Sequence, residues 1–179
     1  MKTLTLLRHA KSGWDDPVER DFDRPLNAKG ERAAQLIGRH LRSLGLEFDH
    51  IIASPAARVG DTIDQLGAGY GRAFVPEWDR RLYLASPVTL LDVIHGLPAE
   101  AERVLLIGHN PGLEELVLLL VPDDASDVLR QEAAAKYPTA TVAEIRFADD
   151  WPSVGAATGT LTRFIRPRDL DPALGPDQA

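Results

Sequence analysis

The fold is decided by the stretch RVLLIGHNPG, residues 103–112, which joins a short apolar run to a turn containing His109. An apolar run of this length, bounded by Asn, Pro and Gly, is typical of a buried strand in a parallel sheet. The leucine-rich residues that follow, from 112 to about 121, predict a helix. The stretch is therefore a strand and a helix with a histidine at the turn between them.

Two other segments repeat this arrangement. Residues 4–7 predict a buried strand that leads into Arg8 and His9, and residues 48–53 predict a strand that leads into a second turn. A helix with Asn27 as its N-cap is expected between these two strands. Further helices are expected over 56–66 and 86–97, and late strands at the edge of the sheet over 141–147 and 160–165. The alternation predicts an α/β fold, a mostly parallel central sheet with helices on both faces.

The composition suits one compact domain, because 44% of the 179 residues are hydrophobic and 26% are charged. We expect a single domain over residues 1–165. Residues 166–179 hold three prolines and little apolar surface, so we expect a loosely packed tail there. The absence of cysteine excludes a cysteine nucleophile, disulfides and thiolate metal sites.

The charge and the apolar runs limit the partners and the location. The net charge of −7 argues against binding to nucleic acid or to an anionic membrane surface. No apolar run reaches the roughly 18 residues that a membrane span requires. The first apolar run is too short for a secretory leader, so we expect a cytoplasmic protein.

The three predicted strand ends carry basic side chains. If the strands are parallel, Arg8, His9, Arg58 and His109 meet at one edge of the sheet, where ligands bind in such folds. Arginine matches phosphate oxygens, and a neutral histidine is able to attack phosphorus. The neighbouring cations favour the neutral imidazole, and a hydrogen bond from its other nitrogen to a carbonyl would fix the tautomer. Each motif alone is also compatible with an ordinary turn or cap, but together they predict a phosphate site.

The combination resembles the histidine phosphatase superfamily, in its SixA-type phosphohistidine phosphatase branch. The motifs that carry the resemblance are Arg8-His9-Ala10-Lys11-Ser12, Asp23-Arg24-Pro25-Leu26-Asn27, Ser54-Pro55-Ala56-Ala57-Arg58, Leu82-Tyr83 and Gly108-His109-Asn110-Pro111-Gly112. The resemblance implies a phosphoglycerate mutase-like three-layer sandwich, a phosphorylated protein as partner, and no cofactor or metal. It also implies that His9 takes the phosphoryl group, that Arg8, Arg58 and His109 hold its oxygens, and that water then releases phosphate.

A general acid is missing from this pattern. Relatives that act on phosphomonoesters place a carboxylate in a segment where this chain has no Asp or Glu between Asp79 and Asp92. Asp21, Asp23 and Asp79 are each explained more simply as partners of nearby arginines. Phosphohistidine is therefore the expected substrate. The alternatives are a phosphatase for small phosphomonoesters, which needs a proton donor, and a catalytically silent module that binds a phosphoprotein.

Several other residues receive no role in the predicted site. His40, His50 and His95 have no second ligand at metal spacing, so we expect them to be structural. Pro138-Thr139 resembles the family's Pro-Thr-Gly loop, but Ala140 replaces the glycine, and Thr139 is assigned no catalytic role. The three tryptophans are expected to pack rather than to line a pocket.

Overall fold

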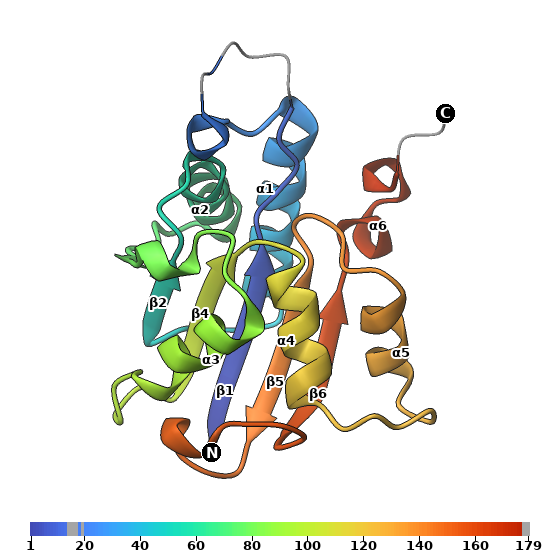
Figure 1. Cartoon of the computed structure of the whole chain (residues 1–179). Coiled ribbons are helices and arrows are strands. Elements are labelled where there is room, and N and C mark those ends of the chain that lie inside the picture. Colours follow the sequence, from blue (N-terminus) through green and yellow to red (C-terminus); the bar gives the residue numbers. More distant parts are fainter. Residues whose placement is uncertain (14–17, 19, 177–179) are drawn as a thin grey trace.

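A six-stranded sheet in the order β3-β2-β4-β1-β5-β6 forms the centre of this computed structural model (Figure 1). Residues 1–13, 18 and 20–176 are described. The parallel part comprises β1 (Lys2–Arg8), β2 (His50–Ala53), β3 (Glu77–Trp78) and β4 (Arg103–Gly108), while β5 (Val142–Phe147) runs antiparallel to β1, and β6 (Gly159–Ile165) antiparallel to β5. The predicted mostly parallel α/β fold is confirmed, with the two late strands at one edge. The short strand β3 was not predicted.

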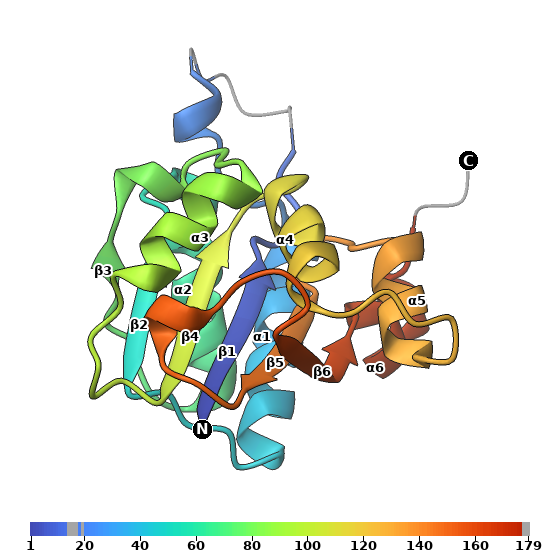
Figure 2. The same ribbon diagram turned by 60° about the horizontal axis from the view of Figure 1, so that its bottom comes forward.

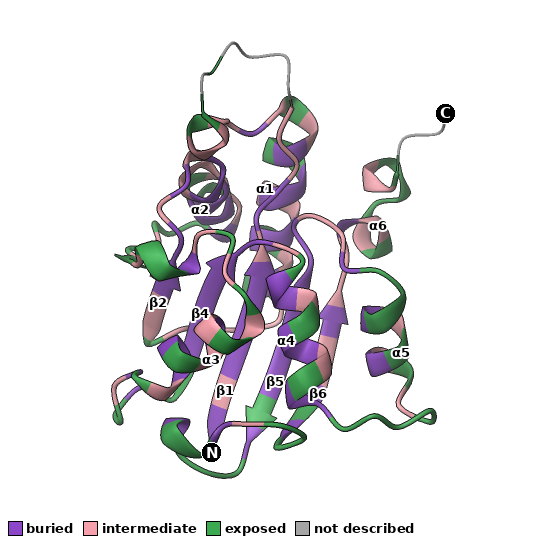
Figure 3. Cartoon of the chain, in the orientation of Figure 1, coloured by how far each residue is buried: buried purple, intermediate pink, exposed green. Residues whose placement is uncertain are grey.

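Helices cover both faces of the sheet. One face carries α1 (Ala28–Ser43) and α2 (Ala57–Tyr70), and the other carries α3 (Pro87–His95), α4 (Gly112–Leu120) and α5 (Val128–Ala135) (Figure 2). Side chains of one strand alternate between the two faces. Leu4 and Leu6 of β1 therefore pack with α3 and α4, whereas Leu7 packs with α1 and α2. Because both faces of the sheet are covered, most residues of the central strands β1 and β4 are buried (Figure 3).

The helix starts follow the sequence signals. The Asn27 side chain accepts a hydrogen bond from the Gly30 N–H, and the Ser86 hydroxyl accepts one from the Thr89 N–H. Both residues are thus the predicted N-caps. Helix α2 continues to Tyr70, beyond its predicted end at Leu66, and stops where Gly71 takes a positive φ.

The described part of the tail contains short helical turns. Residues 167–170 form the short helix α6 (Pro167–Leu170), which is followed by a turn of 3-10 helix, Pro172–Leu174. Leu170 and Leu174 pack against the core that α1 and α2 share, and the Lys29 Nζ donates to the Gly175 carbonyl at 2.6 Å. Among residues 166–176 only Pro167 is buried. No helix within the described ranges is long and apolar enough to cross a membrane.

Candidate active site

The parallel register of β1 and β4 brings two histidines together. Arg8 pairs with Gly108 at the ends of these strands, so His9 and His109 follow side by side, with ring centroids 5.2 Å apart. Arg58 reaches the same point from the first turn of α2, which follows β2. The four residues predicted from the strand ends therefore line one cleft of about 400 Å³.

The cleft gathers positive charge in an acidic protein. Its other described lining residues are Lys11, Ser12, Asp21, Arg24, Leu84, Asn110 and Thr139. Four lysine or arginine side chains thus surround the cavity, against one carboxylate among the described residues. A site with this balance of charge favours an anion.

His9 is buried and held as one tautomer. Its Nδ1 lies 2.7 Å from the Ala10 carbonyl oxygen, which only accepts hydrogen bonds, so Nδ1 carries the proton. The Nε2 then has no proton, and its lone pair accepts a long hydrogen bond from the Arg58 Nε at 3.4 Å. Burial, together with the positive charges of the neighbouring groups, lowers the pKa of His9 to about 3. The ring is therefore neutral at pH 7, with its Nε2 available as a nucleophile.

His109 is neutral as well, in the opposite tautomer. Its Nδ1 lies 3.4 Å from the Arg58 Nη2, which only donates, and its Nε2 lies 2.8 Å from the Ser54 hydroxyl. The proton is therefore on Nε2, where the hydroxyl oxygen accepts it. Burial and the charge of Arg58 lower the pKa of His109 to about 4. In this state the Nδ1 of His109 carries no proton, so it does not donate a hydrogen bond to an anion.

The two arginines are held by different partners. Arg58 is only 2% exposed and donates to both the carbonyl oxygen and the Oδ2 of Asp21, at 2.9 and 3.0 Å. Arg8 donates from Nη1 to the Tyr137 carbonyl at 2.8 Å. Its Nε is buried and has no hydrogen-bond partner in the described chain. Arg8 therefore retains a donor that a bound ligand would satisfy.

Asp21 is a site residue whose role the sequence reasoning missed. The expected pair with Arg24 is present at 3.1 Å, but Asp21 also accepts from Arg58 and, at 2.6 Å, from the Tyr83 hydroxyl. These contacts, led by the hydrogen bond from Tyr83, lower the pKa of Asp21 to about 2. No spacing along the chain links these residues, and only the family motif containing Tyr83 could have drawn attention to them.

The other two carboxylates considered as acids lie outside the cleft lining. Asp23 pairs with Arg20 at the surface, not with Arg24, and Asp79 pairs with Arg81 at 2.6 Å. Pairing of Asp79 with an adjacent arginine agrees with the prediction.

The loop that follows α5 closes one side of the cleft. Ala140 has a φ of +59°, a left-handed conformation that glycine adopts more readily, and its N–H lies 3.0 Å from the carbonyl oxygens of Arg8 and His9. The alanine therefore keeps the backbone of a glycine-type turn, which places Thr139 in the cleft wall. Leu84, another wall residue, also has a positive φ, of 48°.

The described histidines and tryptophans that remain, His40, His50, His95, Trp78 and Trp151, are not part of the cleft lining. The His95 Nε2 lies 2.6 Å from the Val154 carbonyl, and His50 faces Glu77 at 3.4 Å. Trp151 is buried and packs, whereas Trp78 is half exposed and Trp14 falls outside the described residues. No group of three or more His, Asp or Glu in the described ranges could hold a metal ion.

Comparisons with known proteins agree with this geometry. The model of the histidine phosphatase superfamily (branch 1) matches residues 4–82. An uncharacterised protein of Mycobacterium tuberculosis is 31% identical over 163 residues, which cover 90% of this chain and 100% of that protein.

Solved structures are similar to this chain over nearly its whole length. The protein assigned as phosphohistidine phosphatase SixA of Nakamurella multipartitia is 28% identical, with a TM-score of 0.78 over 93% of this chain and 96% of that one. Its counterpart from Agrobacterium tumefaciens is 29% identical, with a TM-score of 0.75 over 93% and 98%. The chain thus belongs to the histidine phosphatase superfamily, in its SixA-type branch.

Proposed function

We propose that this phosphatase hydrolyses phosphohistidine in phosphorylated proteins, through a phosphohistidine intermediate on His9 and without a metal ion. The observation that carries the proposal is the His9 ring, which is neutral and has an unprotonated Nε2 inside a cation-lined cleft. The relatives assigned as phosphohistidine phosphatases support the choice of substrate.

The contacts of the site define a two-step transfer. The His9 Nε2 attacks phosphorus while the bond between phosphorus and the substrate's ring nitrogen breaks. That leaving nitrogen takes a proton from water. A second water then attacks the phosphorus bound to His9 and gives a proton to the hydroxide that the first water left. The bond from phosphorus to Nε2 breaks, which returns the ring to its neutral form and releases inorganic phosphate. Arg8 and Arg58 offset the negative charge of the transferring group in both steps.

The state of Asp21 favours a phosphoramidate over an alkyl ester. An alkoxide leaving group normally requires a positioned acid, which contributes roughly 10² to 10⁴ in rate. Asp21 is the carboxyl in the described cleft lining, and it is ionised at pH 7 because its pKa is about 2. An imidazole leaves without such help once water has protonated it.

A leaving-group series tests the substrate class. We expect kcat/KM to fall from phosphohistidine and phosphoramidate, through aryl phosphates with acidic phenols, to alkyl phosphates. Equal rates on aryl and alkyl phosphates would instead favour the alternative of a small-molecule phosphomonoesterase, with a proton donor that the contacts of Asp21 do not reveal.

Rapid quench with labelled phosphoramidate tests the intermediate. The label is expected on the protein in a linkage that is labile to acid and stable to alkali, and His9→Ala should abolish both labelling and turnover. His50→Ala, which removes a histidine outside the cleft lining, is the matched control. Binding of a phosphoprotein without turnover would favour the silent module.

Independence from metal needs its own measurement. We expect dialysis against a chelator to leave turnover unchanged. Loss of turnover that added zinc or magnesium restores would contradict this part of the proposal.

A further inference from the structure

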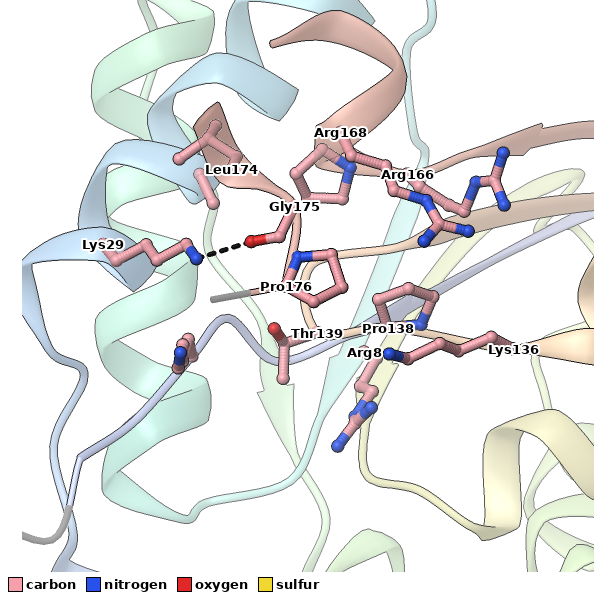
Figure 4. Close-up of a pocket in the computed structure, with 13 residues that line it drawn as sticks. Arg8, Lys29, Lys136, Pro138, Thr139, Arg166, Arg168, Leu174, Gly175 and Pro176 are labelled. Atoms are coloured by element: carbon pink, nitrogen blue, oxygen red, sulfur yellow. Dashed lines mark hydrogen bonds between the residues drawn. The ribbon is translucent and has the colours of Figure 1, made fainter. Parts of the chain in front are cut away.

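A second pocket, of about 230 Å³, lies beside the active-site cleft and shares Arg8, Lys11 and Thr139 with it. Its other walls come from α1, from the residues after α5 and from residues 166–176 (Figure 4). We call this cavity the basic pocket. Because the cleft and the basic pocket share wall residues, a substrate held at His9 is able to extend from one into the other.

The basic pocket concentrates positive charge more strongly than the cleft does. Its cationic lining residues are Arg8, Lys11, Lys29, Lys136, Arg166 and Arg168. None of its described lining residues is acidic, although the whole chain carries a net charge of −7. Like charges gathered in one cavity repel one another, and a bound anion offsets that repulsion.

Contacts within the protein offset only part of this charge. Asp169 pairs with Arg166 at 2.9 Å. No carboxylate of the described residues lies within ion-pair distance of Lys136 or Arg168. These two cations remain to pair with a ligand.

The shape and lining of the basic pocket limit what it accepts. Ala33, Pro167 and Leu174 add apolar surface between the cations. A volume of about 230 Å³ accommodates one or two side chains, but not a helix. A glutamate side chain fits this lining, because its methylene groups contact apolar atoms while its carboxylate meets the cations.

We propose that the basic pocket binds acidic side chains of the substrate polypeptide close to its phosphorylated histidine, so that the enzyme prefers acidic phosphopeptides. The inference rests on the proposed function, because it assigns a neighbouring subsite to the same substrate. A second phosphate group on a small substrate has similar chemistry, and the test separates the two sources.

The test compares two phosphohistidine peptides, with glutamate or glutamine beside the phosphorylated residue, and phosphoramidate as a substrate without a peptide. The variant Lys136→Gln/Arg168→Gln removes two charges from the basic pocket. The matched control Arg39→Gln/Arg103→Gln removes two exposed charges outside the lining of both cavities.

We expect the pocket variant to lower kcat/KM on the glutamate peptide about tenfold, mainly through KM, because it removes two cations and each exposed ion pair contributes up to about fivefold. The glutamine peptide and phosphoramidate should change less than about twofold, and the control should change none of the three. Added salt should weaken the preference for the glutamate peptide.

Other outcomes overturn the proposal. The first is that the wild type hydrolyses both peptides with equal kcat/KM. The second is that the pocket variant loses as much activity on phosphoramidate as on the glutamate peptide. The third is that the pocket variant loses activity only on a small substrate with a second phosphate. If the wild type hydrolyses neither phosphoramidate nor either peptide, the proposed function fails. The proposal for the basic pocket is then tested by peptide binding instead of turnover. Fluorescence anisotropy with a stable phosphonate analogue of the glutamate peptide should then show about tenfold weaker binding to the pocket variant. Equal binding overturns the proposal.

Discussion

At the scale of single residues, the 2.7 Å contact between the His9 Nδ1 and the Ala10 carbonyl sets the chemistry of the ring. It keeps the Nδ1 proton in place while Nε2 faces the cleft. After transfer of the phosphoryl group, the same carbonyl would continue to accept from Nδ1–H. Ala10 itself is fully buried, so water does not compete for the contact.

Burial of neutral His9 and His109 makes stability depend on pH. Their pKa values fall from 6.5 to about 3 and about 4 on folding, so the unfolded chain binds more protons below pH 6.5. The contribution of these neutral histidines to stability is therefore fully present above pH 6.5, and it decreases as the pH falls toward 3. Each histidine contributes a slope of up to about 1.4 kcal/mol per pH unit.

Urea unfolding between pH 6 and pH 4 measures this slope. We expect His9→Asn to lose less stability over that range than the wild type does, by up to about 1.4 kcal/mol per pH unit. Equal slopes for the two proteins would show that His9 is not held neutral.

Anion binding should be linked to proton uptake at His109. The Nδ1 of His109 faces the Arg58 guanidinium as an acceptor, so it needs a proton before it can donate to an oxyanion. A bound dianion raises the pKa of His109 by its charge. Calorimetry with tungstate, in buffers of different ionisation enthalpy, should show proton uptake that grows as the pH falls from 7 to 5. His109→Gln should remove most of this uptake, and an unchanged uptake would contradict the assignment.

The residues of the site were predictable to different degrees. Arg8, His9, Arg58 and His109 follow strand ends, so the topology alone brings them together once the strands are known to be parallel. The links from Asp21 to Arg58 and to Tyr83 depend on how two surface segments fold over the cleft, and no periodicity records that.

At the scale of elements, the backbone of α1 at Gly30 packs directly against the backbone of the loop after His9. A Cβ built on Gly30 would lie 2.0 Å from the Lys11 carbonyl oxygen, which also accepts from the Asn27 N–H. The close approach of helix and loop therefore depends on glycine. This contact explains why the segment 10–13 is held beside the cleft.

Two glycine substitutions test this contact. Gly30→Ala should destabilise the protein by about 1–3 kcal/mol, because the helix or the loop must move, and it should lower kcat/KM. Gly60→Ala is the matched control inside α2, where the added Cβ meets only the Trp78 ring at 3.8 Å. That variant should gain about 0.5–1 kcal/mol from helix propensity. Thermal unfolding measures both, and equal melting temperatures would contradict the account of Gly30.

The ends of helices were predicted best where a capping residue marks them. Asn27 and Ser86 start α1 and α3 as expected, whereas α2 extends past Leu66 because its end depends on Gly71, not on its apolar face. The tail residues Leu170 and Leu174 pack against a core built from distant segments, which their own short segment does not reveal.

At the scale of the whole molecule, the order of the strands in the sheet was only partly predictable from the sequence. Apolar runs identify the long strands, and helical connections make the first ones parallel. The position of β1 between β4 and β5 depends on pairings between distant segments, Leu4 with Val104 and with Ile145. A local pattern carries no information about such pairs.

That position has a consequence for how the protein is made. Strand β1 is synthesised before both of its neighbours in the sheet, β4 and β5, which come from distant parts of the chain. Closing loops of that length is slow, so folding should be slow for a domain of this size. Nascent chains stalled before β5 should be sensitive to protease, and resistance should appear only once residues 142–147 have emerged. His9 would thus be synthesised well before the strands beside β1 are available to form the sheet.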